Sequence, residues 1–256
     1  MAHQLFDITD RVVVVTGGGR GLGAALARGF AEAGARVVIG DQDAQTAQAS
    51  AALIGERGGQ AIATGCDITD PAAMQALLDL ARRHFGGLDV LVNNAGINIP
   101  KPAEDLRLAE WSRIVGVNLT GTFIGCQAAG AIMLAQGSGC IINICSVHGH
   151  VGSYVHKAAA YNASKAGVIN LTRSLALEWG DRGVRVNGIS PGALATELMA
   201  TRLADPEYVR KTLERAAIKR IGTPEDIVGA ALFLASPAAA WITGHMLGVD
   251  GGWLAA

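Results

Sequence analysis

Tyr161 and Lys165 are four residues apart, a spacing that places both side chains on one face of a helix, one turn from each other. An ammonium held near a phenol favours the phenolate and draws the tyrosine pKa down from about 10 towards neutrality. Such a pair predicts a proton donor and acceptor for general acid–base chemistry at physiological pH. The same spacing is also common on a solvated helix face, so the surrounding sequence must decide between the two interpretations.

Two further polar residues stand beside or within apolar segments. Ser146 follows Cys140–Cys145, an apolar run typical of a buried strand. Asn118 lies inside a long apolar helical stretch from Leu108 to about Ala135, where asparagine is disfavoured and needs partners if it is buried. A core amide bonded to backbone is the simplest interpretation of Asn118.

The residues at the start of the chain predict a unit that binds a ligand at a strand end. Val12–Val15 is a β-branched run typical of a strand buried on both faces, and Val37–Ile39 is the next such run. Between them lie a glycine-rich turn and an alanine-rich helix, Ala24–Gly34, which ends in glycine. Strand, turn, helix and strand together predict a βαβ unit.

The glycine-rich turn fits the pattern T-G-x-x-x-G-x-G through Thr16, Gly17, Gly21 and Gly23. Glycines let the backbone turn tightly and approach a pyrophosphate, whose charge then lies at the amino end of the following helix. The commoner form G-x-G-x-x-G/A is matched only by ending on Ala24. With a strand on each side, the turn predicts dinucleotide binding rather than a plain tight connection.

The second strand ends at Asp41, and this residue indicates which dinucleotide is preferred. Its carboxylate is expected to accept hydrogen bonds from the adenosine ribose, and its charge would repel a 2′-phosphate. Arg20, just before Gly21, argues the other way because a guanidinium there could neutralise such a phosphate. Repulsion by a carboxylate already in place is hard to evade, so NAD is predicted over NADP.

The alternation of strands and helices continues, which predicts an α/β fold. We expect one doubly wound Rossmann-type domain over residues 1–256, with about seven parallel strands and helices on both faces. Asp67 begins a turn in which Thr69 or Asp70 caps the next helix, and it either belongs to that turn or reaches the adenine. Asn93 and Asn94, at the end of the strand 88–92, either bridge backbones or line a pocket.

The composition narrows the class of protein. The chain has 256 residues, a net charge of −1 and a pI near 6.6, so nothing indicates nucleic acid or an anionic membrane as a partner. Its N-terminus lacks the pattern of a secretory signal, and no apolar run approaches the ~18 residues that span a bilayer. The four cysteines show neither CxxC pairs nor metal-ligand spacing, which predicts buried thiols in the cytoplasm and no metal site.

Together these motifs resemble those of the short-chain dehydrogenase/reductase family, from about Asp7 to Trp253. The family has the same order of motifs: the glycine turn, Asn93-Asn94-Ala95-Gly96, Asn118, Ser146, Tyr161-x-x-x-Lys165 and Pro191-Gly192. The resemblance implies a nicotinamide-dependent oxidoreductase that interconverts a secondary alcohol and a ketone by hydride transfer.

The same resemblance implies four catalytic residues. Tyr161 would be the acid–base residue, and Lys165 would lower its pKa and hold the nicotinamide ribose. Ser146 would hydrogen-bond the substrate oxygen and stabilise its developing charge. Asn118 would hold a water that relays protons between Lys165 and solvent.

The resemblance also implies the cofactor site. Thr196 resembles the cofactor-contacting threonine of the family, and Leu194 lies where a backbone group meets the nicotinamide amide. The implied cofactor residues follow strand ends, surround the glycine turn or belong to the catalytic pair: Gly17, Arg20, Gly21, Leu22, Gly23, Asp41, Asp67, Ile68, Asn94, Ala95, Gly96, Tyr161, Lys165, Pro191, Gly192, Leu194 and Thr196.

The interval between Ser146 and Tyr161 is longer than is usual in the family and is expected to form one wall of the substrate pocket. Within it, His148 and Lys157 resemble the carboxylate-binding pair of 3-hydroxybutyrate dehydrogenases, and Asn98 falls where those enzymes place an amide. His150 and His156 lie in the same interval. A solvated polar loop is the alternative. The substrate residues implied are Asn98, Ser146, His148, Lys157 and Tyr161.

Other similarities widen the range of substrates. Segments 141–146 and 249–254 look like those of gluconate 5-dehydrogenase and 2-deoxygluconate 3-dehydrogenase. All of these resemblances agree on a small polar secondary alcohol: a sugar acid, a polyol or a hydroxy acid. A 3-oxoacyl-thioester reductase is an alternative, but it would prefer NADPH, against which Asp41 argues. A non-catalytic dinucleotide-binding protein is another, and the complete catalytic set argues against it.

The charged segment from Thr196 to about Ile221 corresponds to the substrate lid of the family. Arg202 or a neighbour is expected to hold a substrate carboxylate when the lid closes, with a solvated helix face as the alternative for most of its charges. Thr223 is predicted to cap the helix that follows. The apolar faces of the helices at 108–135 and 161–180 exceed what one side of a sheet would cover, which with the family precedent predicts a homotetramer.

Overall fold

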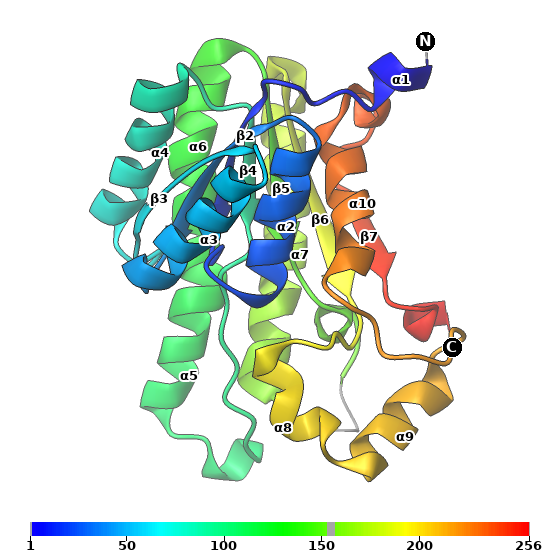
Figure 1. The fold of residues 1–256 in the computed structure, drawn as a ribbon. Coiled ribbons are helices and arrows are strands. Elements are labelled where there is room, and N and C mark those ends of the chain that lie inside the picture. The colour runs from blue at the N-terminus through cyan, green and yellow to red at the C-terminus, as the bar shows by residue number, and fades with distance from the viewer. Residues whose placement is uncertain (1, 153–156, 256) are drawn as a thin grey trace.

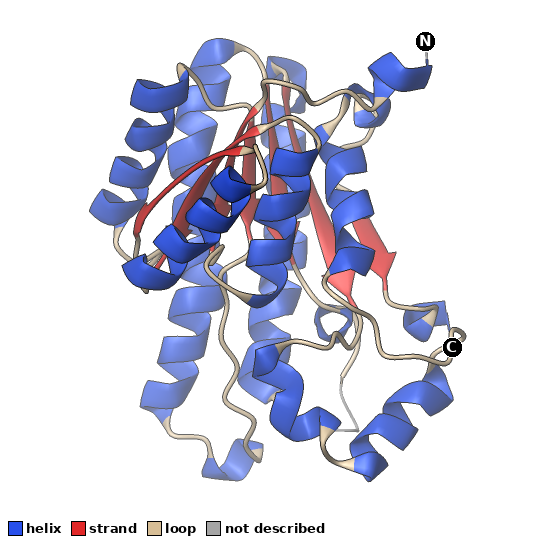
Figure 2. Ribbon diagram, in the orientation of Figure 1, coloured by secondary structure: helices blue, strands red, loops and turns tan. Residues whose placement is uncertain are grey.

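A computed structural model describes residues 2–152 and 157–255, and seven parallel strands in it form one sheet. The strand order is β3-β2-β1-β4-β5-β6-β7, with helices on both faces (Figures 1 and 2), which confirms the predicted fold class. The strands are β1 (Val12–Thr16), β2 (Arg36–Asp41), β3 (Gln60–Gly65), β4 (Val90–Asn93), β5 (Gly139–Ile144), β6 (Val184–Pro191) and β7 (Met246–Val249). The order reverses between β1 and β4, and ligands of doubly wound folds bind at the carboxyl ends of strands beside such a point.

The helices lie in two layers. One layer, against one face of the sheet, contains α2 (Gly21–Glu32), α3 (Ala44–Glu56) and α10 (Glu225–Ala235). The other contains α4 (Pro71–Phe85), α6 (Thr122–Gln136) and α7 (Ala159–Trp179), and α5 (Leu108–Val115) packs against α7. A short helix, α1 (Ala2–Leu5), precedes β1.

The central strand β1 shows why the sheet is buried on both sides. Val13 and Val15 pack into the layer of α2, whereas Val12 and Val14 pack into the layer of α4. Successive side chains of a strand point to opposite faces, so a strand covered on both faces must be apolar at every position. The run of four valines meets this requirement, and all four are buried.

Helices α5 and α6 are joined by a π-helical turn, Gly116–Gly121, so that helical structure is continuous from Leu108 to Gln136. This stretch has 29 residues and contains an 18-residue window with a mean hydropathy of 1.3, so by length and composition alone it could cross a membrane. The expectation that the chain contains no such segment is therefore wrong. In the fold the stretch is a core helix, because α6 packs against α4, β4 and β5.

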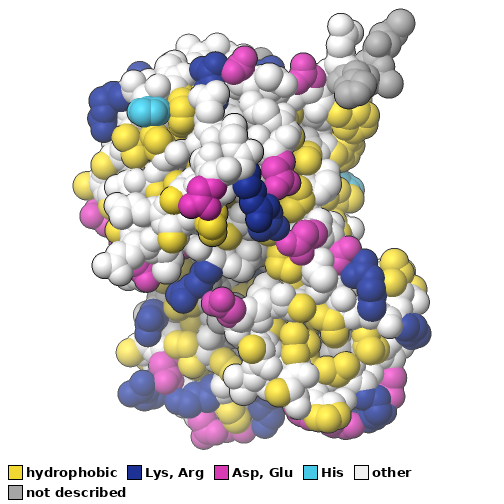
Figure 3. All heavy atoms as spheres, in the orientation of Figure 1, with side chains coloured by type: hydrophobic (Ala, Val, Ile, Leu, Met, Phe, Trp, Pro, Cys, Tyr) yellow, Lys and Arg dark blue, Asp and Glu magenta, His cyan; other side chains and the backbone are white. Residues whose placement is uncertain are grey.

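The segment 196–221, here called the lid segment, lies beyond the carboxyl ends of β6 and β7. It contains α8 (Ala200–Leu203) and α9 (Pro206–Arg215), and the C-terminus lies beside α9 (Figure 1). On the face shown in Figure 3, acidic and basic side chains are interspersed, and hydrophobic side chains gather over the region of α8 and α9.

The starts of α4 and α10 test the helix caps that were predicted from the sequence. Asp70 caps α4 by accepting a hydrogen bond from the backbone N of Ala72 at 2.9 Å. The prediction that Thr223 caps α10 is wrong, because Pro224 occupies the N-cap position. The Asp226 carboxylate instead accepts a hydrogen bond from the backbone N of Thr223 at 2.7 Å.

Candidate active site

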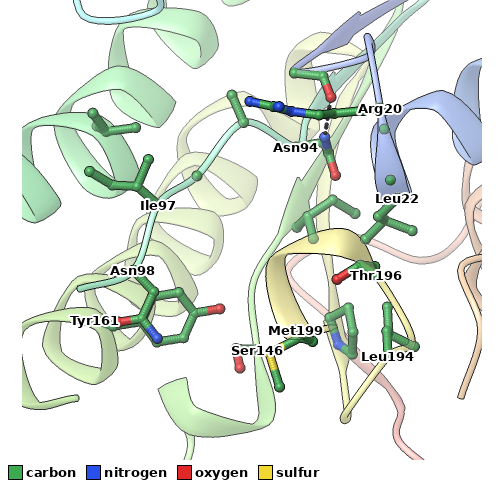
Figure 4. Close-up of a pocket in the computed structure, with 18 of the residues that line it drawn as sticks. Arg20, Leu22, Asn94, Ile97, Asn98, Ser146, Tyr161, Leu194, Thr196 and Met199 are labelled. Atoms are coloured by element: carbon green, nitrogen blue, oxygen red, sulfur yellow. Dashed lines mark hydrogen bonds between the residues drawn. The ribbon is translucent and has the colours of Figure 1, made fainter. Parts of the chain in front are cut away.

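A cleft of about 1640 Å³ runs along the carboxyl ends of the strands. In Figure 4, Arg20 lies at one end of the cleft, and Tyr161 and Ser146 point toward one another at the other. All seventeen predicted cofactor residues line this cleft, as do four of the five predicted substrate residues. The cleft therefore joins the glycine turn to the Tyr161 region within one continuous space.

The glycine turn is shaped so that only glycines fit at two of its positions. A Cβ on Gly23 would lie 1.9 Å from the carbonyl oxygen of Gly17, and one on Gly17 would lie 2.9 Å from the Cα of Ala95. Gly17 also has a φ of +63°, a conformation that side chains other than glycine rarely adopt. Asn94 Nδ2 donates to the carbonyl oxygens of Thr16 and Gly17, each at 3.0 Å. The turn thus presents bare backbone to the cleft, which suits a pyrophosphate.

The end of the cleft next to β2 carries both charged residues that bear on the choice between NAD and NADP, Asp41 and Arg20. Asp41 Oδ2 accepts a hydrogen bond from the backbone N of Gly19 at 3.0 Å, and Oδ1 accepts one from the backbone N of Asp43 at 3.1 Å. Its carboxylate is thereby fixed beside the glycine turn. Arg20 is exposed and forms no ion pair with any described residue.

The polar residues after β3 and at the end of β4 also have structural contacts. Asp67 Oδ1 accepts hydrogen bonds from the backbone N and Oγ1 of Thr69, at 2.9 and 2.7 Å, so Asp67 belongs to the turn and also lines the cleft. Asn93 Nδ2 donates to Asn143 Oδ1 at 2.9 Å, and Asn143 Nδ2 donates to Thr172 Oγ1 at 2.9 Å. This buried chain joins β4, β5 and α7 beneath the site.

Asn118, at the centre of the π-helical turn, is fully buried and does not line the cleft. Its Nδ2 donates to the carbonyl oxygen of Ile97 at 2.9 Å and to Ser164 Oγ at 3.0 Å, while its Oδ1 accepts from the backbone N of Ile97 at 2.8 Å. These contacts are those of a core amide that ties the segment after β4 to α7. A Cβ on Gly96 would lie 3.3 Å from Asn118 Oδ1 and 3.6 Å from Lys165 Nζ, so both atoms lie close to Gly96. The proton relay stays a prediction.

Tyr161, Lys165 and Ser146 are brought together as the sequence predicts. Helix α7 places Lys165 Nζ 5.8 Å from the centre of the Tyr161 ring, and the ammonium donates to the carbonyl oxygen of Ile144 at 2.7 Å. Ser146 lies two residues after the end of β5 and forms a hydrogen bond with the Tyr161 side chain. Ser146 Oγ also accepts from the backbone N of His148 at 3.1 Å.

The pKa of Tyr161 is raised, which corrects the expectation drawn from its spacing to Lys165. Burial is the main cause, and the hydrogen bond with Ser146 and the charge of Arg202 act in the opposite direction. Burial also lowers the pKa of the Lys165 ammonium. The Lys165 ammonium is hydrogen-bonded to the carbonyl oxygen of Ile144, and burial decides the direction in which the Tyr161 pKa moves.

The predicted substrate residues divide into two groups. Asn98 and His148 line the cleft, and burial together with the charges of Arg202 and Arg215 lowers the pKa of the His148 imidazole to about 4. Lys157 is exposed and does not line the cleft, and its backbone carbonyl accepts a hydrogen bond from the backbone N of Lys101 at 3.0 Å. Of the two residues that resemble a carboxylate-binding pair, His148 therefore lines the cleft and Lys157 does not.

Of the other two histidines of that interval, His150 is described and contributes no side chain to the cleft. His150 Nε2 lies 2.9 Å from Ser190 Oγ, and His150 does not line the cleft. His156 lies outside the described residues. Within the described ranges, no group of three or more His, Cys, Asp or Glu side chains could hold a metal ion.

Some of the cleft residues that were not predicted come from the lid segment and the C-terminus. Met199, Tyr208 and Thr212 line the cleft from the lid segment, and Trp253 lines it from the C-terminal turn. Tyr208 and Thr212 are four residues apart on α9 and both buried, a periodicity that could have predicted an inward face. Trp253 follows Gly251 and Gly252, which permit a sharp reversal after the last strand.

Arg202 also lines the cleft, as the lid hypothesis requires. It is partly buried, and its Nη1 lies 3.8 Å from Met199 Sδ. No carboxylate of the described residues forms an ion pair with it. Arg202, His148 and Tyr161 all line this cleft, and the positive charge of Arg202 acts to lower the pKa of the other two side chains, although burial raises that of Tyr161.

Comparison with known proteins identifies the family. A family model described as enoyl-(acyl carrier protein) reductase matches residues 17–254, nearly the whole chain. The cis-4-hydroxycyclohexanecarboxylate dehydrogenase of Sinomonas cyclohexanicum is 45% identical over 248 residues, which cover 96% of this chain and 97% of the relative. The chain belongs to the short-chain dehydrogenase/reductase family. This short-chain dehydrogenase/reductase is an oxidoreductase that acts on CH–OH groups, as the sequence predicts.

Solved structures of the family carry both kinds of cofactor. A gluconate 5-dehydrogenase from Burkholderia cenocepacia, in complex with NADP and tartrate, is 36% identical, with a TM-score of 0.95 and 100% of each chain covered. A 7α-hydroxysteroid dehydrogenase, complexed with NADH and 7-oxo glycochenodeoxycholic acid, is 38% identical, with a TM-score of 0.92 and 98% and 96% of the two chains covered. Relatives of this short-chain dehydrogenase/reductase thus bind NAD(P) and act on secondary alcohols of varied structure.

Proposed function

We propose that the enzyme is an NAD-dependent dehydrogenase of a small secondary alcohol that carries a carboxylate, a hydroxy acid or sugar acid. The observation that carries this proposal is Arg202, a partly buried cation without a carboxylate partner among the described residues, at the end of the cleft that holds Ser146 and Tyr161.

The residues at the other end of the cleft fit a dinucleotide. The glycine turn offers bare backbone to the pyrophosphate, and Asp41 is fixed where the adenosine ribose would lie. Lys165, which lines the cleft, would hold the second ribose. When bound, the nicotinamide supplies the hydride acceptor or donor.

Ser146 would hold the substrate oxygen, and Tyr161 would transfer the proton. With the substrate oxygen between the two hydroxyls, Ser146 donates a hydrogen bond to that oxygen and holds it in place. As hydride leaves the carbon, Tyr161 takes the hydroxyl proton, and in the reverse direction it returns that proton to the ketone oxygen. The raised pKa of Tyr161 favours the protonated form, which is the form that reduction requires.

The lid segment supplies the contact that would select an anionic substrate. Burying a carboxylate without a partner is costly, whereas a guanidinium can bind both of its oxygens at once. His148 beside Arg202 is neutral at physiological pH, because its pKa is about 4, so it adds no competing charge and can hydrogen-bond a polar group. The permanently charged guanidinium of Arg202 and the neutral imidazole of His148 would therefore face the substrate.

Arg202→Ala is expected to raise KM for a hydroxy acid or sugar acid by about tenfold to a hundredfold, because a charge-assisted hydrogen bond is lost. The KM for an uncharged polyol should change little. Steady-state absorbance of the reduced cofactor measures both, across hydroxy acids, sugar acids and polyols with NAD and then NADP. Arg210→Ala is the matched control, since Arg210 is exposed on α9 and pairs with Glu207.

Equal changes in KM for charged and uncharged substrates would contradict the role of Arg202. An absence of turnover with any secondary alcohol would contradict the proposed function itself.

We also propose that the enzyme is a cytoplasmic homotetramer. Leu108, Trp111 and Phe123 are 78%, 39% and 41% exposed on α5 and α6, and Leu177 of α7 is 87% exposed. Such apolar side chains on neighbouring helices are typical of a surface that another subunit covers. The four free cysteines are buried, which suits a reducing compartment. Light scattering should give a mass of four 26.3 kDa chains, and a monomeric mass would contradict the tetramer.

A further inference from the structure

One buried indole joins three segments that are far apart in the sequence. Trp253 is 5% exposed. Its indole forms an edge-to-face contact with the imidazole of His148, with ring centres 5.4 Å apart and an interplanar angle of 87°. The Arg215 guanidinium lies 3.9 Å from the centre of the indole, and Arg215 Nε donates to the carbonyl oxygen of Trp253 at 3.1 Å. The segment that contains Ser146 and His148, here called the Ser146 loop, therefore meets the end of α9 and the C-terminal turn at Trp253.

The C-terminal turn holds the indole in place through its own backbone. Gly251 and Gly252 both have positive φ, +65° and +79°, which lets the chain reverse after β7. The Asp250 carboxylate accepts hydrogen bonds from the backbone N of Gly252 and of Leu254, each at 2.9 Å. The backbone N of Ile218, in the lid segment, also donates to the carbonyl oxygen of Gly251 at 2.9 Å, so the turn is held both by its own carboxylate and by the lid segment.

The two residues that contact the indole, His148 and Arg215, are each connected to residues that line the cleft. On one side, the backbone N of His148 donates to Ser146 Oγ, and Ser146 bonds to Tyr161. On the other side, Arg215 ends the helix whose Tyr208 and Thr212 line the cleft. A displacement of the indole would therefore alter both the orientation of the serine hydroxyl and the attachment of α9.

We propose that Trp253 is a positioning residue that fixes the lid segment to the Ser146 loop. The indole restrains the His148 ring, and through the backbone of His148 it orients the hydroxyl of Ser146. The cation–π contact with Arg215 holds α9 against the same indole. The proposal rests on Ser146 and Tyr161 being the reacting groups, as stated under the proposed function.

The test compares Trp253→Ala with Trp253→Phe, and Arg215→Met with the matched control Arg210→Met on the exposed side of α9. Trp253→Ala should lower kcat on the order of a hundredfold, because small errors in the placement of reacting groups are costly. Its dissociation constant for NADH, measured by fluorescence titration, should stay within about twofold of wild type. Trp253→Phe should recover most of the loss, since phenylalanine retains an aromatic face and edge.

Limited trypsin digestion supplies a second readout that needs no turnover. Cleavage of the native protein within the lid segment should become about tenfold faster in Trp253→Ala and Arg215→Met, because the released α9 opens more often. Arg210→Met should be cleaved elsewhere in the lid segment at the wild-type rate. Circular dichroism shows whether each variant is folded, and if Trp253→Ala is not, then Trp253→Phe and Arg215→Met decide the matter.

Trp253→Ala with kcat and trypsin cleavage both within about twofold of wild type would overturn the proposal. Faster cleavage with unchanged kcat would also overturn it, since the indole would then hold the lid segment without positioning Ser146. If the wild type turned over no alcohol, the proposed function would fail, while the cleavage rates would still show whether Trp253 fixes α9.

Discussion

Tyr161→Phe is expected to lower kcat on the order of a thousandfold, the contribution typical of a positioned acid–base group. The ring, which is buried beside Lys165, is retained, so the dissociation constant for NADH should not change. Steady-state absorbance and a fluorescence titration measure the two quantities. Tyr208→Phe removes the hydroxyl of another buried tyrosine of the cleft and serves as the control, with kcat expected to stay near wild type. Residual activity in Tyr161→Phe above a tenth of wild type would show that another group is the base.

The same residue should set the dependence of the rate on pH. Burial raises the pKa of Tyr161, so the phenolate that accepts a proton during oxidation becomes more populated as pH rises. The rate of alcohol oxidation is therefore expected to increase with pH, and the rate of ketone reduction to decrease. Both slopes should be lost in the residual activity of Tyr161→Phe.

Removing the charge of Asp41 is expected to shift the ratio of kcat/KM for NADP over NAD upward on the order of a hundredfold, because a like-charge repulsion at close range disappears. Asp41→Asn is the informative variant. Its amide oxygen can still accept from the backbone N of Gly19 or Asp43, which keeps the glycine turn in place. Steady-state kinetics with each cofactor give the ratio.

The contribution of Arg20 can be separated in the same experiment. Adding Arg20→Ala to Asp41→Asn should remove much of the gain with NADP, because the exposed guanidinium at that end of the cleft is the cation available to a 2′-phosphate. A wild-type enzyme with higher kcat/KM for NADP than for NAD would show that Arg20 outweighs Asp41.

The strands and the cofactor end of the cleft could be predicted because their signals are local. Four consecutive valines indicate a strand buried on both faces, and the glycines that follow can be identified by type and spacing alone. Asp41 is located by its place at the end of the next strand. Parallel strands bring their carboxyl ends to one edge, so residues after strand ends converge there without knowledge of the packing.

The substrate end could not be predicted with the same success because it is formed by contacts between distant segments. Trp253 meets His148 across about a hundred residues of sequence, and neither residue carries a local sign of that contact. Lys157 illustrates the opposite error: its resemblance to a carboxylate-binding lysine depended on the path of a loop, and the structure leaves it exposed. The predicted fall in the pKa of Tyr161 was wrong for a related reason, since the burial of a side chain cannot be judged from its spacing to another residue.

The π-helical turn at Gly116–Gly121 has a consequence for engineering the enzyme. A Cβ on Gly116 would meet nothing within 4 Å, so alanine fits there and would raise helix propensity by about 1 kcal/mol. The same substitution favours regular α-helical spacing, which would rotate Asn118 away from Ile97 and Ser164. Thermostabilisation guided by helix propensity in this turn would therefore reduce activity as it raised the melting temperature.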